Sequence, residues 1–285
     1  SRSSTDKSSV ARPVDARRVW LERTHVRFDP PLLPGTLVRR YKRFLTDVTL
    51  PSGETVVAHC ANTGSLTGCL AENSRVLLRP ASNPERKLRY SWLVVEAQGT
   101  WVGLDTSLAV PLVVEAIGGP LLPELAGYER TLTEVPYGNE RSRIDVLLSR
   151  GGSAPKDKKA RLHTGDERVY VEVKNTTLAE GVGSDRFARF PDAVTERGTK
   201  HLRELASMVR EGHRAVLVFV AQRADCVAFA PADDVDPLYG TTLREVVRAG
   251  VEVFALGASI DASGAKLTSR LPVRLDVRRP SMPPR

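Results

Sequence analysis

The sequence predicts an α/β protein (α+β overall) in which a small β-barrel precedes a mixed central sheet flanked by helices. Short alternating runs separated by turn residues fill residues 26–105, and helical and strand-like runs alternate over residues 106–276. The chain has 285 residues, 41% of them hydrophobic, which is enough to pack two modest domains. We expect residues 1–25 to form a disordered basic tail and residues 277–285 a frayed one.

Five strands are predicted in the first domain. Residues 36–50 are expected to form one long strand, which the turn residues at 51–53 end. Five short strands with turn-rich connections are what an OB-like barrel requires. The other four strands are expected at 54–60, 74–79, 90–96 and 100–104.

A basic segment lies within the first of these strands. Four of the residues in 39–43 are positively charged and the fifth is a tyrosine. OB-type barrels bind single-stranded nucleic acid through a basic groove and stacking aromatic rings. The alternative is that Tyr41 or the nearby Phe44 belongs to the core and that the charges are only solvated. We predict nucleic-acid contacts from Arg39, Arg40, Tyr41, Lys42 and Arg43.

The loop at residues 62–68 contains two glycines and several hydroxyl or amide side chains. Such a loop can present backbone N–H groups to a phosphate, which makes Asn62 and Thr63 candidates for the nucleic-acid site. The alternative is a tight turn between two strands, which is the more common outcome for a single glycine-rich loop.

Two strand-like runs in the second domain carry the residues of a candidate catalytic site. In residues 168–174, three valines alternate with residues that include Glu172 and Lys174, so both of these point to the polar face of a strand. In residues 142–148, the apolar positions leave Asp145 on the opposite face. If the two strands pair, Asp145, Glu172 and Lys174 converge on one side of a sheet.

This trio suits the hydrolysis of a phosphodiester. Two carboxylates can hold Mg²⁺ (or Mn²⁺), and a lysine beside the cation can orient water and offset charge in the transition state. We therefore predict Asp145 and Glu172 as metal ligands and Lys174 as a catalytic residue. The alternative is a Glu-x-Lys pair on the solvent face of an edge strand, which has no chemical role.

Longer segments resemble a known family. Asp145 followed by Glu172-Val173-Lys174 is similar to the D…(D/E)xK signature of the PD-(D/E)xK nucleases. The chain closely resembles the sugar fermentation stimulation protein family over about residues 27 to 275, which implies an N-terminal OB-like barrel, a PD-(D/E)xK nuclease-like C-terminal domain, non-specific DNA binding and a regulatory role in sugar metabolism. The segments that carry this resemblance are RYKRFL at 40–45, NTGSLTG at 62–68, YGNERSRID at 137–145, VEVKNTTL at 171–178 and FPDAVTERGTKHLREL at 190–205.

The same resemblance implies a further glutamate from the helix that precedes the core sheet. Glu115, in a helix predicted from residue 106 or 107 to the Gly118-Gly119-Pro120 stop signal, is the candidate third metal ligand and catalytic acid. Glu134 and Glu140 are its rivals. An exposed acid at a helix end is the alternative interpretation of Glu115.

A long helix is predicted at residues 192–212, and apolar residues at helical spacing give it a face that packs on the sheet. Arg197, Lys200 and His201 lie beside that face. Placed against the polar edge of the sheet, Arg197 and Lys200 can contact phosphates and His201 the scissile region. A histidine alone on a helix is more often a surface or packing residue.

The composition is compatible with a polyanionic partner. The net charge is +8 and the pI is about 9.6, which suits DNA, single- or double-stranded, as well as a merely basic protein. Three cysteines without a C-x-x-C pair, no apolar run of 18 residues and no apolar signal segment predict a cytoplasmic, nucleoid-associated protein without a membrane span. The oligomeric state stays open, a dimer included. The alternative function is a non-catalytic, non-specific DNA-binding regulator of sugar metabolism genes that retains the nuclease fold.

Overall fold

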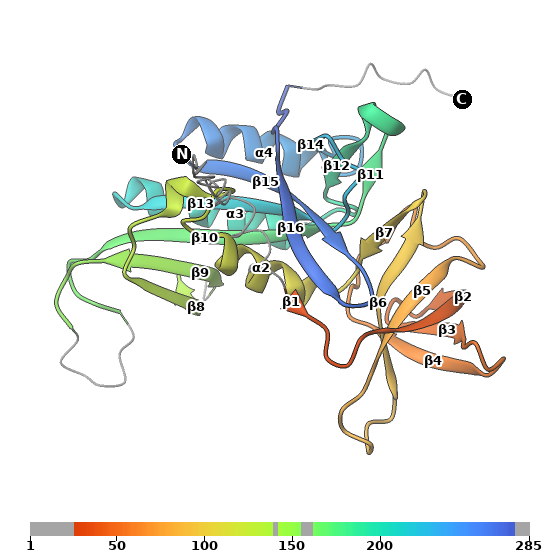
Figure 1. Cartoon of the computed structure of the whole chain (residues 1–285). Coiled ribbons are helices and arrows are strands. Elements are labelled where there is room, and N and C mark those ends of the chain that lie inside the picture. The colour runs from red at the N-terminus through yellow and green to blue at the C-terminus, as the bar shows by residue number, and fades with distance from the viewer. Residues whose placement is uncertain (1–25, 139–141, 155–161, 277–285) are drawn as a thin grey trace, which may run out of the picture.

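The architecture is taken from a computed structural model that describes residues 26–138, 142–154 and 162–276. The segments expected to form tails, 1–25 and 277–285, and the rival acid Glu140 lie outside the described residues. The described chain folds into a barrel and a larger sheet that carries helices (Figure 1).

The barrel is a six-stranded antiparallel sheet closed on itself. Its strands are β2 (Leu33–Tyr41), β3 (Leu45–Thr49), β4 (Thr55–Cys60), β5 (Arg75–Pro80), β6 (Tyr90–Ala97) and β7 (Thr100–Gly103). The strand order is β4-β3-β2-β5-β6-β7, and a parallel pairing of β4 with β6 closes the barrel. Leu37, Val48, Val76 and Trp92 fill its interior and are at most 1% exposed. The predicted OB-like barrel is confirmed.

The first predicted strand is in fact a hairpin. Residues 36–50 divide into β2 and β3, because the chain turns at Lys42 and Arg43, whose φ angles are 49° and 65°. Glycine, asparagine and aspartate are the residues that usually signal such a turn, and none lies here. The side chain of Arg40 stabilises the turn instead by donating from Nε to the carbonyl of Arg43 at 2.8 Å.

The second domain is built on a seven-stranded mixed sheet. Its strands are β1 (Val26–Arg27), β8 (Arg130–Tyr137), β9 (Ser142–Arg150), β10 (Glu167–Thr176), β13 (Arg214–Ala221), β15 (Glu252–Ile260) and β16 (Gly264–Leu271). The order is β1-β16-β15-β13-β10-β9-β8, with β10, β13 and β15 parallel to one another. Residue 26 was expected to begin the barrel, but β1 pairs with β16 and therefore extends this sheet.

Helices cover both faces of the sheet, and different helices pack on each face. Helix α2 (Ala109–Ala116) follows the short 3-10 turn η1 (Thr106–Leu108) and packs on the face that carries Val169, Val171 and Val173. Helices α3 (Glu196–Arg210) and α4 (Pro237–Arg248) pack on the other face, with Tyr170. In Figure 1, α2 lies below the sheet and α4 above it. The alternation predicted for residues 168–174 is confirmed.

The remaining elements lie beyond the ends of the central strands. A small sheet contains β11 (Ala179–Glu180), β12 (Phe187–Phe190) and β14 (Ala228–Pro231), and η2 (Pro123–Leu125) and η3 (Gly183–Asp185) are short 3-10 turns. Helix α3 begins later than predicted, because Thr195 caps it by accepting a hydrogen bond from Gly198 N at 3.0 Å. Val194, expected on its buried face, precedes the helix and is 72% exposed.

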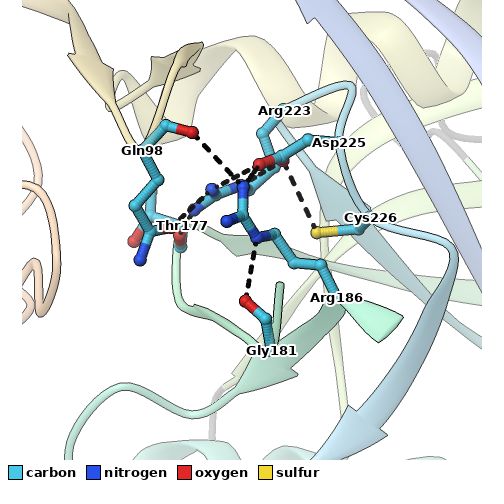
Figure 2. Close-up of polar contacts among 7 residues, drawn as sticks. All are labelled: Gln98, Thr177, Gly181, Arg186, Arg223, Asp225 and Cys226. Carbon is cyan, nitrogen blue, oxygen red and sulfur yellow. Dashed lines mark hydrogen bonds and ion pairs between the residues drawn. The ribbon is translucent and has the colours of Figure 1, made fainter. Parts of the chain in front are cut away.

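A buried cluster of charges joins the two domains (Figure 2). The guanidinium of Arg223, 2% exposed, bonds Asp225 through two nitrogens and donates to the carbonyl of Thr177 at 3.1 Å and to Oε1 of the barrel residue Gln98 at 2.9 Å. Arg186 pairs with the same Asp225. The barrel is therefore fixed to the sheet domain by specific hydrogen bonds as well as by the covalent connection.

All three cysteines are buried, free thiols, as expected for small core residues. Burial raises the pKa of Cys69 to about 11 and that of Cys226 to about 12, so these thiols stay protonated at neutral pH. Within the described residues, no helix has both the length and the apolar character needed to span a membrane.

Candidate active site

The site forms where β9 and β10 separate. The two strands are paired as far as Val146 and Val171, and Asp145 and Glu172 are the next residue on each strand. Val173 N donates to Oδ2 of Asp145 at 2.6 Å, so this carboxylate takes the place of a backbone partner where the ladder ends. Because the two strands diverge here, Asp145 and Glu172 lie just beyond the last paired residues and form a carboxylate pair.

Lys174 and His201 both contact Glu172. Nζ of Lys174 lies 2.5 Å from Oε1 of Glu172, and Nδ1 of His201, from helix α3, is hydrogen-bonded to the same oxygen. Glu172 is 2% exposed, and its Oε2 has no hydrogen-bond partner in the part of the chain that the structure describes. The spacing of residues 172 and 174 along a strand places both side chains on the α3 side of the sheet, as the alternation predicted.

A cavity of about 400 Å³ opens at this point. Its lining combines the carboxylates of Asp145, Glu172 and Glu134 with cations from the strands and from α3. A carboxylate floor with a positively charged wall suits a phosphate diester bound through a divalent cation. The cations in the lining are Arg143, Lys174, Arg197 and Lys200, and His201 completes the wall.

The two central carboxylates have opposite pKa shifts. Burial, together with the charge of Glu172, raises the pKa of Asp145 from 3.8 to about 6. Burial also acts to raise the pKa of Glu172, but the charge of Lys174 and the hydrogen bond from His201 outweigh it and lower that pKa. Burial and the neighbouring negative charge therefore disfavour the ionised form of Asp145.

Replacing Asp145 with asparagine should stabilise the metal-free protein. The pKa of Asp145 is higher in the folded state than its ordinary 3.8, so its ionisation destabilises the fold increasingly between pH 3.8 and 6 and fully above pH 6. At pH 8 the gain in the free energy of unfolding should be about 2 to 3 kcal/mol, since one pKa unit is roughly 1.4 kcal/mol. Urea denaturation of both proteins in EDTA measures it. The gain should shrink at pH 4.5; an equal gain at both pH values would contradict the assignment.

Glu115 does not lie at this site. It is exposed on α2, which packs on the opposite face of the sheet from α3. Its rival Glu134 lines the cavity instead. Thr133 pairs with Val146 and Val135 with Ile144, so Glu134 lies opposite Asp145 on the neighbouring strand β8. Its φ of 54° is in the left-handed region, which a non-glycine residue adopts only at an energetic cost.

Sequence reasoning missed Arg143 as a residue of the cavity. It is exposed on β9, two residues before Asp145, and donates from Nη1 to the carbonyl of Glu134 at 3.3 Å. The period of two along a strand was the available signal, because it places Arg143 on the same face as Asp145.

The loop at 62–68 lies against the segment that leads into α3. Ser65 Oγ donates to the carbonyl of Asp192 at 2.5 Å, and Leu66 N donates to Oδ2 of Asp192 at 3.1 Å. A side chain at Gly64 would place its Cβ 2.5 Å from the same carboxylate, so the Asp192 side chain would have to move. Thr63 is exposed beside these contacts. The loop therefore joins the barrel to the wall of the cavity.

Arg40 and Asn62 are engaged within the protein rather than directed to solvent. Arg40 Nη2 donates to the carbonyls of Asn62 and Gly64 at 2.9 and 3.0 Å. Asn62 is 8% exposed and accepts from Gly64 N through Oδ1 at 2.9 Å. Both residues shape the loop, which differs from the direct nucleic-acid contact expected of them.

The tip of the β2–β3 hairpin carries the remaining basic residues. Lys42 and Arg43 are exposed, and Phe44 beside them is 46% exposed. Arg39 lies over the ring of Tyr41 at 5.2 Å, and both side chains bond Asp47. Arg39 and Tyr41 therefore share a face, as the period of two along a strand requires, while Arg43 lies in the turn at the tip.

The residues present suit a divalent cation of the Mg²⁺ type. Mg²⁺ keeps several waters and is usually bound through one or two carboxylates and substrate phosphates. Asp145 and Glu172 would supply the carboxylates, and the buried Oε2 of Glu172 lacks a partner among residues 26–138, 142–154 and 162–276. In the described residues no group of three or more His, Cys, Asp or Glu side chains is arranged to hold a metal ion, so a cation at the carboxylate pair would take its remaining ligands from water and phosphate.

Fold and site together define a class of two-domain proteins, in which an OB-like barrel is attached to an α/β domain with a mixed central sheet. Residues 38–104 match the SfsA N-terminal OB domain, and residues 107–264 match the Sugar fermentation stimulation protein RE domain. The chain therefore belongs to the sugar fermentation stimulation protein family.

Individual relatives agree with this assignment. The sugar fermentation stimulation protein homologs of Thioalkalivibrio sulfidiphilus and Geobacter metallireducens are 49% and 50% identical to the chain, over 87% and 88% of its length and 98% and 100% of theirs. A solved structure, Pyrococcus furiosus SfsA in complex with Ca²⁺, is 29% identical with a TM-score of 0.71, and the match covers 86% of this chain and 96% of that one.

Proposed function

We propose that the protein binds DNA and hydrolyses its phosphodiester bonds with Mg²⁺ or Mn²⁺ bound at Asp145 and Glu172. The observation that carries this proposal is the carboxylate pair at the point where β9 and β10 separate, with Lys174 beside it in an open cavity. The Pyrococcus furiosus relative is described in complex with Ca²⁺, a cation that takes oxygen ligands as Mg²⁺ does, which supports a cation site in this family.

Five charged residues of the cavity have roles in this mechanism. A bound cation supplies Lewis-acid stabilisation of charge on the phosphoryl group. Asp145 and Glu172 hold the cation through their oxygens. Lys174 donates a hydrogen bond from Nζ to the attacking water or to a phosphate oxygen, which orients the one or stabilises charge on the other. Arg143 and Lys200 bind the flanking phosphates from the wall of the cavity, which fixes the scissile bond against the carboxylates.

The activity is tested with purified full-length protein and end-labelled single- and double-stranded DNA of mixed sequence. Cleavage is expected with Mg²⁺ or Mn²⁺ and should stop in EDTA, and the Glu172→Gln variant serves as the control for a contaminating nuclease. DNA binding without cleavage in either metal would contradict the hydrolytic proposal and favour the regulator that retains the nuclease fold. Absence of DNA binding would contradict both functions.

The hairpin tip is proposed to bind single-stranded DNA by stacking a base on Phe44. An exposed aromatic ring flanked by the cations Lys42 and Arg43 offers a π surface and charge for the adjacent phosphates. Lys42 and Arg43 both lie in the left-handed region, at an energetic cost that a glycine would avoid.

Phe44→Ala should weaken binding of single-stranded DNA by about tenfold, because stacking of one base contributes roughly 1–3 kcal/mol. Fluorescence anisotropy with a labelled oligonucleotide in EDTA measures the change without cleavage. Leu70→Ala is the matched control, since Leu70 is also a barrel residue and is 40% exposed. Equal affinities for both variants and the unaltered protein would exclude the stacking contact. This outcome would not contradict the proposed cation site.

A further inference from the structure

His201 is buried between α3 and the carboxylate pair. It is 6% exposed and makes contacts through both ring nitrogens. Nδ1 is hydrogen-bonded to Oε1 of Glu172, and Nε2 lies 3.4 Å from Nε of Arg197, one helical turn earlier. A ring held at both nitrogens has little capacity left for a DNA strand, in contrast to the nucleic-acid contact expected from the sequence.

The donor and acceptor capacity of each side chain decides the direction of these hydrogen bonds. The guanidinium of Arg197 can only donate, so Nε2 of His201 must accept and carries no proton in this arrangement. The proton of the neutral ring therefore lies on Nδ1, which donates to Glu172. Lys174 also can only donate, so its Nζ, 3.4 Å from Nδ1, acts on Glu172 rather than on the ring. The hydrogen bonds thus run in one direction, from Arg197 through His201 to Glu172.

We propose that His201 is a positioning residue for the cation site, oriented by Arg197, which holds the Glu172 carboxylate in the geometry that binds a divalent cation. His201 and Lys174 together occupy Oε1 of Glu172, and Oε2 is left without a hydrogen-bond partner among the described residues. Carboxylates that ligate a metal are themselves held by hydrogen bonds from neighbouring groups, and loss of such a group reduces metal affinity. This inference rests on the proposed function, because it concerns the same cation site.

Affinity for Mn²⁺, measured by isothermal titration calorimetry on the full-length protein without DNA, tests the role directly. His201→Ala is expected to weaken Mn²⁺ binding about 10- to 100-fold. His201→Asn keeps an N–H donor near the position of Nδ1 and should restore most of the affinity. Arg197→Met removes the donor that sets the ring and should cause a smaller loss. His59→Ala, in strand β4 of the barrel, is the control and should bind Mn²⁺ as the unaltered protein does.

The possible outcomes distinguish failure of the positioning role from failure of the proposed function. If the unaltered protein does not bind Mn²⁺, the cation site itself fails and the inference fails with it. If the unaltered protein binds Mn²⁺ and both His201 variants bind it equally well, only the positioning role is overturned. Weaker DNA binding by His201→Ala with unchanged Mn²⁺ affinity would instead assign His201 to the DNA. If His201→Ala does not fold, His201→Asn decides: restored affinity supports the role, and a loss as large as that of the Glu172→Gln variant contradicts it.

Discussion

Lys174→Met is expected to reduce metal-dependent DNA cleavage by roughly 10²- to 10⁴-fold, the range for removal of a group that positions or transfers protons at the reacting atoms. Lys174 is the cation that contacts Glu172 at 2.5 Å, and methionine keeps the length of the side chain while removing its donors. Single-turnover cleavage with saturating protein measures the chemical step. DNA affinity in EDTA should change little, since other cations line the cavity.

The control for this variant is Lys266→Met, which removes an exposed lysine from β16. It should cleave DNA at the rate of the unaltered protein, because a change in net charge alone acts on binding rather than on the chemical step. A Lys174→Met protein that cleaves at an undiminished rate would remove this residue from the mechanism. A large loss of DNA affinity would mean that Lys174 binds phosphate rather than acting on the reaction.

Arg223→Met is expected to lower the free energy of unfolding by about 3 to 5 kcal/mol, the usual result of breaking a buried ion pair from one side. Arg223 is almost fully buried and makes hydrogen bonds to Asp225, Thr177 and Gln98. Without Arg223, Arg186 is the only arginine among the described residues that still pairs with Asp225 (Figure 2). Urea denaturation followed by circular dichroism measures the effect.

Arg75→Met is the matched control, because Arg75 is 68% exposed and pairs with Glu96 at 3.2 Å on the surface of the barrel. Exposed pairs contribute about 0–1 kcal/mol, so this variant should differ little from the unaltered protein. Equal losses in the two variants would show that the junction contributes no more than a surface pair. A separate unfolding transition for the barrel in Arg223→Met would support its role in joining the domains.

Most of the fold could be predicted from local patterns. The alternation in residues 168–174 placed Glu172 and Lys174 on one face, and the continuous apolar run at 214–221 coincides with β13. Such patterns depend only on whether a strand is covered on one or both faces. The turn at Lys42 and Arg43 was missed because cations in the left-handed region carry no turn signal, and its stability depends on Arg40, whose partners lie up to 24 residues away.

The site was predicted less completely, because its composition depends on which face each element covers. The family resemblance made Glu115 the candidate third ligand, but the sequence could not reveal that α2 packs on the face opposite to Glu172. Glu134 reaches the cavity through its pairing opposite Asp145, which is a tertiary property. Arg40 and Asn62 have the chemistry of phosphate ligands, yet Arg40 bonds carbonyls 22 and 24 residues away and Asn62 accepts from Gly64 N, so both are engaged within the barrel.

The hydrogen-bonded junction between barrel and sheet has a consequence for the proposed cleavage. Because Arg223 bonds Gln98 of the barrel directly, a strand bound to the hairpin tip in the proposed manner would reach the carboxylates after a constant number of nucleotides. The proposed reaction would then give fragments whose lengths cluster around one value and are independent of base sequence.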